Sequence, residues 1–138
     1  MKRHLMDASS LMLLMKTASI QIELNYLRTS SILDLTFYEV GNAIWKETRL
    51  TKFITKEESE VLRNRVQTVL AKTERIPCEA NSFQRILDVS ASEQLSFYDA
   101  SYLFNAKEKG LVLVTEDKEL RTKAEKSIEV RNVASLLS

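Results

Sequence analysis

The sequence predicts an α/β protein in which helices cover both faces of a parallel β-sheet. Short apolar strand segments alternate with amphipathic helical segments along the chain, as in βα units joined by right-handed crossovers. Residues 111–115 (LVLVT) are apolar at four consecutive positions, as expected of a strand covered on both faces. The chain has only two glycines and one proline, too few for the many turns of an all-β sandwich.

The first half of the chain contains two predicted strands and three predicted helices. They are a strand at 4–6, a helix at 9–16, a strand at 31–36, a helix at 37–50 and an amphipathic helix at 57–73. Arg65 is expected on the solvated face of the last helix. One segment stays ambiguous. Ile20, Ile22 and Leu24 alternate as in a strand, whereas Ile20, Leu24 and Leu27 also fit a helical face.

The second half begins after a break at Pro77. We expect helices at 82–89 and 97–109, a strand at 111–115, a helix at 118–126, a strand at 128–131 and a helix at 133–137. Gly110 is the predicted C-cap of the helix before it, because glycine adopts the left-handed conformation that ends helices.

Composition bounds the possible functions. A chain of 138 residues, 44% of them apolar, supports a single domain over residues 1–138 without a disulfide or structural metal. One cysteine and one histidine do not supply the usual zinc ligands, and two glycines exclude a phosphate-binding loop. The longest apolar run, residues 11–15, is too short to span a membrane. We therefore expect a soluble, cytoplasmic protein with no membrane association.

Four carboxylates fall at junctions between predicted elements. Asp7 follows the first strand, and Asp117 follows the strand that ends at Thr115. Glu39 lies in the first turn of the helix after the strand at 31–36. In a parallel sheet, ligands bind beyond the carboxyl ends of the strands, which is where these three acids are expected. Asp99 begins a helix with no predicted strand before it, so its location is less constrained.

A shared acidic site would require a cation. Two carboxylates about 5 Å apart repel by about 3 kcal/mol at an effective dielectric constant of about 20. An all-oxygen site favours Mg²⁺ or Mn²⁺ over zinc, and metal ions held by acids are typical of phosphodiester hydrolysis. With the four acids set aside, the remaining charge is 20 − 15 = +5, which would attract a polyanion.

The same acids have a purely structural interpretation. Acids are favoured in the first turn of any helix, and Thr36 to Glu39 and Ser96 to Asp99 both match the capping-box spacing. Asp7 would then be an ordinary N-cap. Spacing alone favours four independent caps over one shared site.

Local sequence context changes that balance. The segments DASS at 7–10, YEVGNAIWK at 38–46, YDASYL at 98–103 and LVTEDKEL at 113–120 occur in this order. They resemble the motifs of PIN-domain proteins, most closely the VapC-like toxins of prokaryotic toxin–antitoxin pairs. The resemblance covers nearly the whole chain. It implies a Rossmann-like α/β/α sandwich with a central parallel sheet, and Mg²⁺- or Mn²⁺-dependent endoribonuclease activity.

The resemblance also assigns roles to individual residues. The catalytic and metal-binding acids would be Asp7, Glu39, Asp99 and Asp117, supported by Asn42 and the hydroxyl of Thr115. A metal-activated water would hydrolyse RNA at this four-carboxylate site. The implied partners are an RNA substrate, a small VapB-like antitoxin and a second copy of the chain. Two alternatives stay open, a non-catalytic interaction module and a PIN nuclease that processes RNA or DNA without an antitoxin.

Other side chains have weaker functional interpretations. Trp45, Tyr98 and Tyr102 could stack on bases, although core packing is favoured for Trp45. Lys46 lies two helical turns after Glu39 and could contact phosphate, although a solvated lysine is favoured. The apolar residues 11–15 are expected in the core, and an exposed part of them could receive an antitoxin helix.

Overall fold

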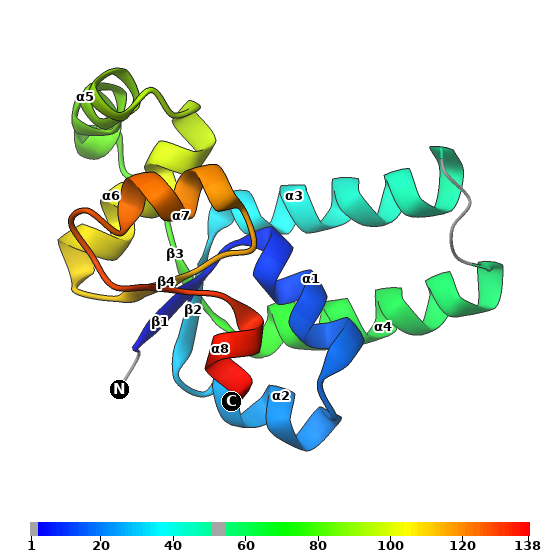
Figure 1. Cartoon of the computed structure of the whole chain (residues 1–138). Helices are drawn as coiled ribbons and strands as arrows, with labels where there is room; N and C mark the ends of the chain where they lie inside the picture. Colours follow the sequence, from blue (N-terminus) through cyan, green and yellow to red (C-terminus); the bar gives the residue numbers. More distant parts are fainter. Residues whose placement is uncertain (1–2, 51–54) are drawn as a thin grey trace.

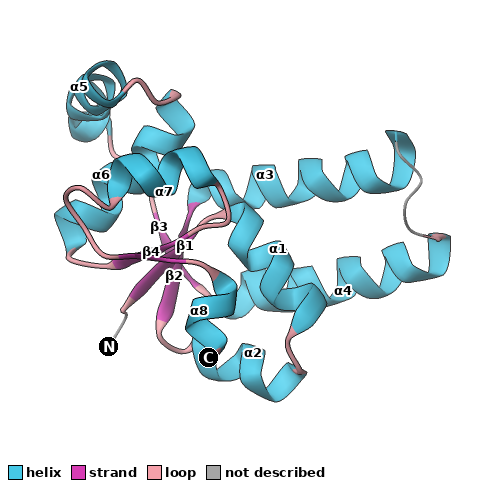
Figure 2. Ribbon diagram, in the orientation of Figure 1, coloured by secondary structure: helices cyan, strands magenta, loops and turns pink. Residues whose placement is uncertain are grey.

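The computed structural model describes residues 3–50 and 55–138. Its centre is a five-stranded sheet in which every pair of neighbouring strands is parallel, in the order β3-β2-β1-β4-β5 (Figure 2). The strands are β1 (His4–Met6), β2 (Ser30–Leu33), β3 (Glu74–Ile76), β4 (Val112–Val114) and β5 (Val130–Arg131). The strand order reverses between β1 and β4, and it is at such a switch point that open parallel sheets bind ligands.

Helices cover both faces of this sheet (Figure 1). They are α1 (Ala8–Thr17), α2 (Ile20–Leu27), α3 (Asp34–Trp45), α4 (Lys56–Lys72), α5 (Phe83–Glu93), α6 (Phe97–Lys109), α7 (Lys118–Ala124) and α8 (Val133–Leu137). A π-helical turn, η1 (Lys46–Leu50), extends α3, and a 3₁₀ turn, η2 (Ala80–Ser82), precedes α5. In Figure 1, α3 and α4 extend well beyond the sheet. No described helix is long and apolar enough to cross a membrane.

Two apolar clusters, one on each face, hold the sheet between the helices. Leu5 and Leu113 pack with α5, α6 and α7, whereas Met6 and Val114 pack with α1 to α4 and α8. All four side chains are fully buried, which contributes roughly 1.5–3 kcal/mol for each. Strand β4 is apolar at successive positions because both faces of the sheet are covered by helices, as the sequence predicts.

The helix bounds agree with the sequence in most places. Helix α6 spans the predicted residues and ends at Gly110, whose φ of 65° lies in the left-handed region. The ambiguous segment after α1 is the helix α2, which begins where the Ser19 side chain accepts a hydrogen bond from Ile22 N. This capping bond favours the helix over the alternating strand pattern.

Two predictions at the sheet were wrong. The predicted strand at 31–36 ends at Leu33, because α3 already begins at Asp34. Glu39 consequently lies in the second turn of α3 and not in the first. The edge strand β3 was not predicted, since its first two residues, Glu74 and Arg75, are exposed and charged.

Arg65 does not lie on a solvated face. Its guanidinium pairs with the carboxylate of Glu23, which is 3% exposed, and donates to Ala18 O at 3.2 Å. The ion pair joins α4 to α2. A buried carboxylate requires such a partner, because isolated charge is costly inside a protein.

Arg65→Met is expected to lower the free energy of unfolding by about 2–3 kcal/mol, because it leaves the Glu23 charge buried without its partner. Chemical denaturation measures the change, with the exposed neighbour Arg63→Met as the matched control. The double variant Glu23→Leu/Arg65→Met should recover most of the loss. An Arg65→Met protein as stable as the control would contradict a structural role for the pair.

Candidate active site at the carboxyl edge of the sheet

Asp7 directly follows β1, donates its backbone N–H to Val114 O at the end of β4 at 3.1 Å, and is the N-cap of α1. Its carboxylate is 6% exposed and accepts hydrogen bonds from Ser10 N at 2.9 Å, from Ser9 Oγ at 2.8 Å and from the Thr115 hydroxyl. Burial raises the pKa of Asp7, and these hydrogen bonds to the charged form oppose the rise. Asp7 is thus a desolvated carboxylate held in one orientation.

The loop after β4 contacts Asp7 through two hydroxyl groups. Glu116 N donates to Ser9 Oγ at 3.2 Å, and Asp117 N donates to Thr115 Oγ1 at 3.0 Å. Each hydroxyl therefore accepts from the backbone of this loop and donates to Asp7. Asp117 is exposed and caps α7, accepting from Leu120 N at 3.0 Å. The predicted supporting residue Thr115 thus connects two of the candidate acids.

Glu39 reaches the site from α3. Its Oε1 accepts a hydrogen bond from Tyr102 Oη of α6 at 2.7 Å. Partial burial raises the pKa of Glu39 and the negative charge of Asp7 raises it further, while the hydrogen bond from Tyr102 lowers it. Glu39 caps no helix, so the interpretation of four independent caps fails for this residue.

Asp99 lies in the first turn of α6, where Asp99 N donates to the N-cap Ser96 Oγ at 3.1 Å. Partial burial and the negative charges of Asp117, Asp7 and Glu39 raise the pKa of Asp99 to about 6. Asp99 therefore lies within electrostatic range of the other three predicted acids, and Glu39 lies within range of Asp7. Two of them, Asp7 and Asp117, are at the same time helix caps, so the two interpretations of the sequence are compatible.

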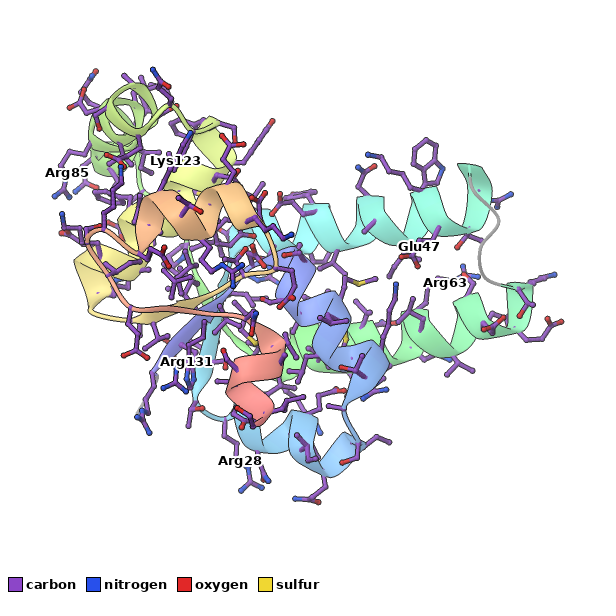
Figure 3. The ribbon with its side chains drawn as sticks, viewed as in Figure 1. Arg28, Glu47, Arg63, Arg85, Lys123 and Arg131 are labelled. Atoms are coloured by element: carbon purple, nitrogen blue, oxygen red, sulfur yellow. The ribbon has the colours of Figure 1, made fainter. Side chains whose placement is uncertain are left out.

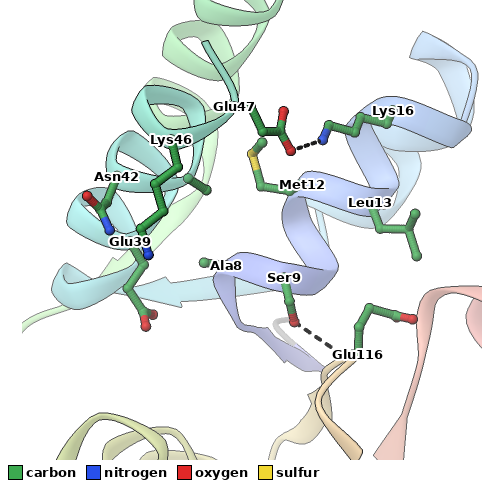
Figure 4. Close-up of a pocket in the computed structure, with 11 residues that line it drawn as sticks. Ala8, Ser9, Met12, Leu13, Lys16, Glu39, Asn42, Lys46, Glu47 and Glu116 are labelled. Carbon is green, nitrogen blue, oxygen red and sulfur yellow. Dashed lines mark hydrogen bonds and ion pairs between the residues drawn. The ribbon is translucent and has the colours of Figure 1, made fainter. Parts of the chain in front are cut away.

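A groove between α1 and α3 extends from the acids. It has a volume of about 670 Å³ and is lined by Ala8, Ser9, Met12, Leu13, Lys16, Glu39, Asn42, Ala43, Lys46, Glu47 and Glu116 (Figure 4). Glu39 and Asn42 on α3 and Lys46 at the start of η1 follow one another along one side of the groove. A salt bridge of 2.6 Å between Lys16 Nζ and Glu47 Oε1 joins the two sides of the groove. Of the four candidate acids, Glu39 lines this groove, beside cationic and apolar side chains.

The donor set of the acidic site suits a hard divalent cation. All four side chains offer carboxylate oxygens, which Mg²⁺ and Mn²⁺ prefer. As placed, no three His, Cys, Asp or Glu side chains within residues 3–50 and 55–138 are grouped closely enough to hold a metal ion. The fit therefore rests on the donor chemistry and on the mutual repulsion of the acids, which a cation would relieve.

Two predictions about aromatic residues were wrong. Tyr102 is 1% exposed and cannot stack on a base, whereas Trp45, expected in the core, is 50% exposed. Tyr98 is 60% exposed and stays available for stacking. The contact of Tyr102 with Glu39 was missed, although Asp99 and Tyr102 stand three residues apart and thus share a helix face.

Several cationic side chains lie away from the candidate site. The labelled cations in Figure 3 lie on separate elements, with Arg85 on α5, Lys123 on α7, Arg131 on β5 and Arg63 on α4. Several pair with nearby acids, as Lys123 does with Glu119 at 2.9 Å. The basic surface expected from the charge count is therefore partly neutralised by local ion pairs.

Comparisons with known proteins identify the family. A family model described as PIN domain matches residues 16–126. The chain is a PIN-domain protein. The matched span of this PIN domain contains Glu39, Asp99 and Asp117 and begins after Asp7. The chain is also 37% identical over 130 residues to exonuclease VapC9 of Pyrobaculum aerophilum, covering 94% of this chain and 92% of that protein.

Solved structures share this PIN-domain fold. The crystal structure of PAE2754 from Pyrobaculum aerophilum has a TM-score of 0.83 and 33% sequence identity, covering 99% of this chain and 87% of that chain. DNA-bound VapBC from Salmonella typhimurium has a TM-score of 0.66 and 17% sequence identity, and the match covers 96% of this chain and 99% of that chain. The second likeness shows the fold alone. The Rossmann-like architecture with a central parallel sheet is thus confirmed.

Proposed function

We propose that this PIN-domain protein is a divalent-cation-dependent endoribonuclease, and that it is the toxin of a VapBC-type toxin–antitoxin pair. The observation that carries the proposal is the hydrogen-bonded connection of Asp7 to the backbone of Asp117 through the Thr115 hydroxyl, with Glu39 and Asp99 close enough for the negative charge of Asp7 to raise the pKa of each. The relative named exonuclease VapC9 supports nuclease chemistry. RNA in the cytoplasm is the substrate that this proposal implies.

The proposed cation ligands are Asp7, Glu39, Asp99 and Asp117, with Mg²⁺ or Mn²⁺ as the ion. When bound, such an ion activates water and screens the negative charge of a phosphodiester. The Asp7 carboxylate is pre-oriented by its three donors, so little reorganisation is needed at this ligand.

Residues of the groove would orient the substrate. Asn42 on α3 and Lys46 at the start of η1 line the groove with Glu39, and their amide and ammonium groups would contact the RNA backbone. Lys16 faces them from α1. Phosphate contacts of this kind position a nucleic acid without reading its sequence.

The test is cleavage of a circular single-stranded RNA with Mg²⁺, with Mn²⁺ and with EDTA. Linearisation of the circle in the presence of either cation, and none in EDTA, is the expected result. The circle matters because an exonuclease needs a free end and would leave it intact. A matched circular DNA tests the substrate. Failure to cleave any RNA in either cation would favour the non-catalytic interaction module.

The proposed antitoxin would enter the groove between α1 and α3. Helix α1 buries Leu11, Leu14 and Met15 in the core, while Met12 and Leu13 line the groove. An apolar wall beside a basic and an acidic side chain suits an amphipathic helix. Solved structures of similar fold include FitAcB from Neisseria gonorrhoeae and DNA-bound VapBC from Salmonella typhimurium, which supports such a partner.

We also propose a homodimer that uses an apolar patch on the α5–α6 side. The patch consists of the exposed residues Tyr38, Phe83 and Tyr98, with Phe37 in edge contact with Tyr38. A hollow of about 690 Å³ lies among α3, α5 and α6 and is lined by Tyr38, Phe83 and Tyr98. Exposed apolar clusters of this kind mark protein interfaces.

Phe83→Ser is expected to convert a dimer to a monomer, because it places a hydroxyl in the centre of the patch. Sedimentation equilibrium measures the mass, and Val61→Ser on α4, also exposed, is the control. A wild-type chain that sediments as a monomer at micromolar concentration, or a Phe83→Ser variant that stays dimeric, would contradict this interface.

A further inference from the structure

Tyr102 is a buried side chain that contacts the candidate site through its hydroxyl. It is 1% exposed and lies on α6, facing α3. Its Oη donates to Glu39 Oε1 at 2.7 Å and lies 2.8 Å from Thr36 Oγ1. Burial raises the pKa of Tyr102, so the phenol keeps its proton and acts as a donor to the carboxylate.

The direction of each hydrogen bond in this group follows from its neighbours. Leu33 N donates to Thr36 Oγ1 at 3.1 Å. Because the Tyr102 proton points to Glu39, the Thr36 proton must point to Tyr102 Oη. A directed series of donors therefore runs from the backbone at the end of β2, through two hydroxyls, to the Glu39 carboxylate.

We infer that Tyr102 is a positioning residue for Glu39 and that Thr36 orients Tyr102 in turn. The inference rests on the proposed function. Glu39 stands on a half-buried face of α3, where a glutamate side chain has several rotamers. The bond from Tyr102 fixes Oε1 and selects one of them. Partners that orient a metal ligand in this way typically contribute 10–100-fold in metal affinity or activity.

A structural role for the ring alone makes a different prediction. The Tyr102 ring packs in the cluster with Leu103 and Leu113, and a phenylalanine would fill the same space. Only the hydroxyl reaches Glu39. Tyr102→Phe therefore separates packing from positioning, because it keeps the ring and removes one hydrogen bond.

The experiment measures Mn²⁺ affinity of the protein without RNA, by electron paramagnetic resonance of free Mn²⁺. Tyr102→Phe is expected to weaken Mn²⁺ binding roughly 10–100-fold. The matched control is Tyr26→Phe, which loses a tyrosine hydroxyl bond to Leu136 O on the far side of the molecule. The control should bind Mn²⁺ within about twofold of wild type, as expected for distant, independent sites.

Thr36 variants test the order of the series. Thr36→Val removes the hydroxyl and should weaken Mn²⁺ binding by less than Tyr102→Phe does. Thr36→Ser keeps a hydroxyl at this position and should bind Mn²⁺ as the wild type does. The double variant Thr36→Val/Tyr102→Phe should bind no more weakly than Tyr102→Phe alone, because Thr36 acts through Tyr102. Multiplicative losses in the double variant would contradict this order.

The outcomes distinguish this inference from the proposed function. Weak Mn²⁺ binding by Glu39→Gln together with wild-type binding by Tyr102→Phe would overturn the positioning role and leave the nuclease proposal standing. Wild-type protein that binds no Mn²⁺ and cleaves no RNA would overturn both. If Tyr102→Phe and Tyr26→Phe weakened Mn²⁺ affinity equally, the loss would come from lower stability of the fold, and the positioning role would be overturned.

Discussion

Asp99→Asn is expected to lower RNA cleavage by at least about 10³-fold, a loss typical of removing one member of a catalytic group. Asparagine keeps the shape of the side chain and removes the charge that a cation would bind. The Ser96 cap also survives, because its bond goes to the backbone N of residue 99. Cleavage of labelled single-stranded RNA in Mn²⁺ measures the loss, and the exposed Asp88→Asn of α5 is the control.

The same substitution is expected to stabilise the fold above pH 6. The pKa of Asp99 is raised to about 6, so in wild type stability is lost as pH rises from about 4 to about 6. The Asp99→Asn variant carries no charge at this position and avoids this loss. After allowance for solvent screening, the gain at pH 7 is about 1–2 kcal/mol. Two results would contradict this role of Asp99. One is an Asp99→Asn protein that is inactive because it is unfolded. The other is an Asp99→Asn protein whose free energy of unfolding falls between about pH 4 and about pH 6 as much as that of the wild type.

Mn²⁺ is expected to raise the free energy of unfolding at pH 7 by about 2.7 kcal/mol when its concentration is 100 times its dissociation constant. The stabilisation should shrink at pH 5, because Asp99 is then protonated and the raised pKa values of Asp7 and Glu39 act in the same direction. Scanning calorimetry with EDTA as reference measures both values. Equal stabilisation at pH 5 and pH 7, or an undiminished effect in Asp99→Asn, would place the cation elsewhere.

Sequence reasoning predicted the fold most reliably where local signals agree. Helix α6 has an N-cap at Ser96 and a left-handed glycine at its end, so both bounds were predicted. Thr36 shows the opposite case. Its strand-like context predicted a longer β2, but Thr36 lies in the first turn of α3, where its hydroxyl accepts a hydrogen bond from Leu33 N. Edge strand β3 pairs with β2 alone, and its exposed charges carry no strand periodicity.

The candidate site was predictable where acids follow strands. Asp7 and Asp117 are fixed near each other by the pairing of β1 with β4. Asp99 was harder to place, since its position depends on how α6 packs over the sheet. Tyr102 was missed as a partner of Glu39, because the spacing of Asp99 and Tyr102 places both on one face of α6 but does not show that this face meets α3. The role of these acids as cation ligands stays a prediction.

The most direct test of the shared acidic site is a crystal structure of the protein soaked in Mn²⁺, with anomalous diffraction recorded at the manganese edge. We expect an anomalous peak enclosed by the carboxylates of Asp7, Glu39, Asp99 and Asp117. In crystals of the Asp99→Asn variant, this peak should be absent. A peak on other side chains, or none at millimolar Mn²⁺, would contradict the proposal that these four acids form one cation site.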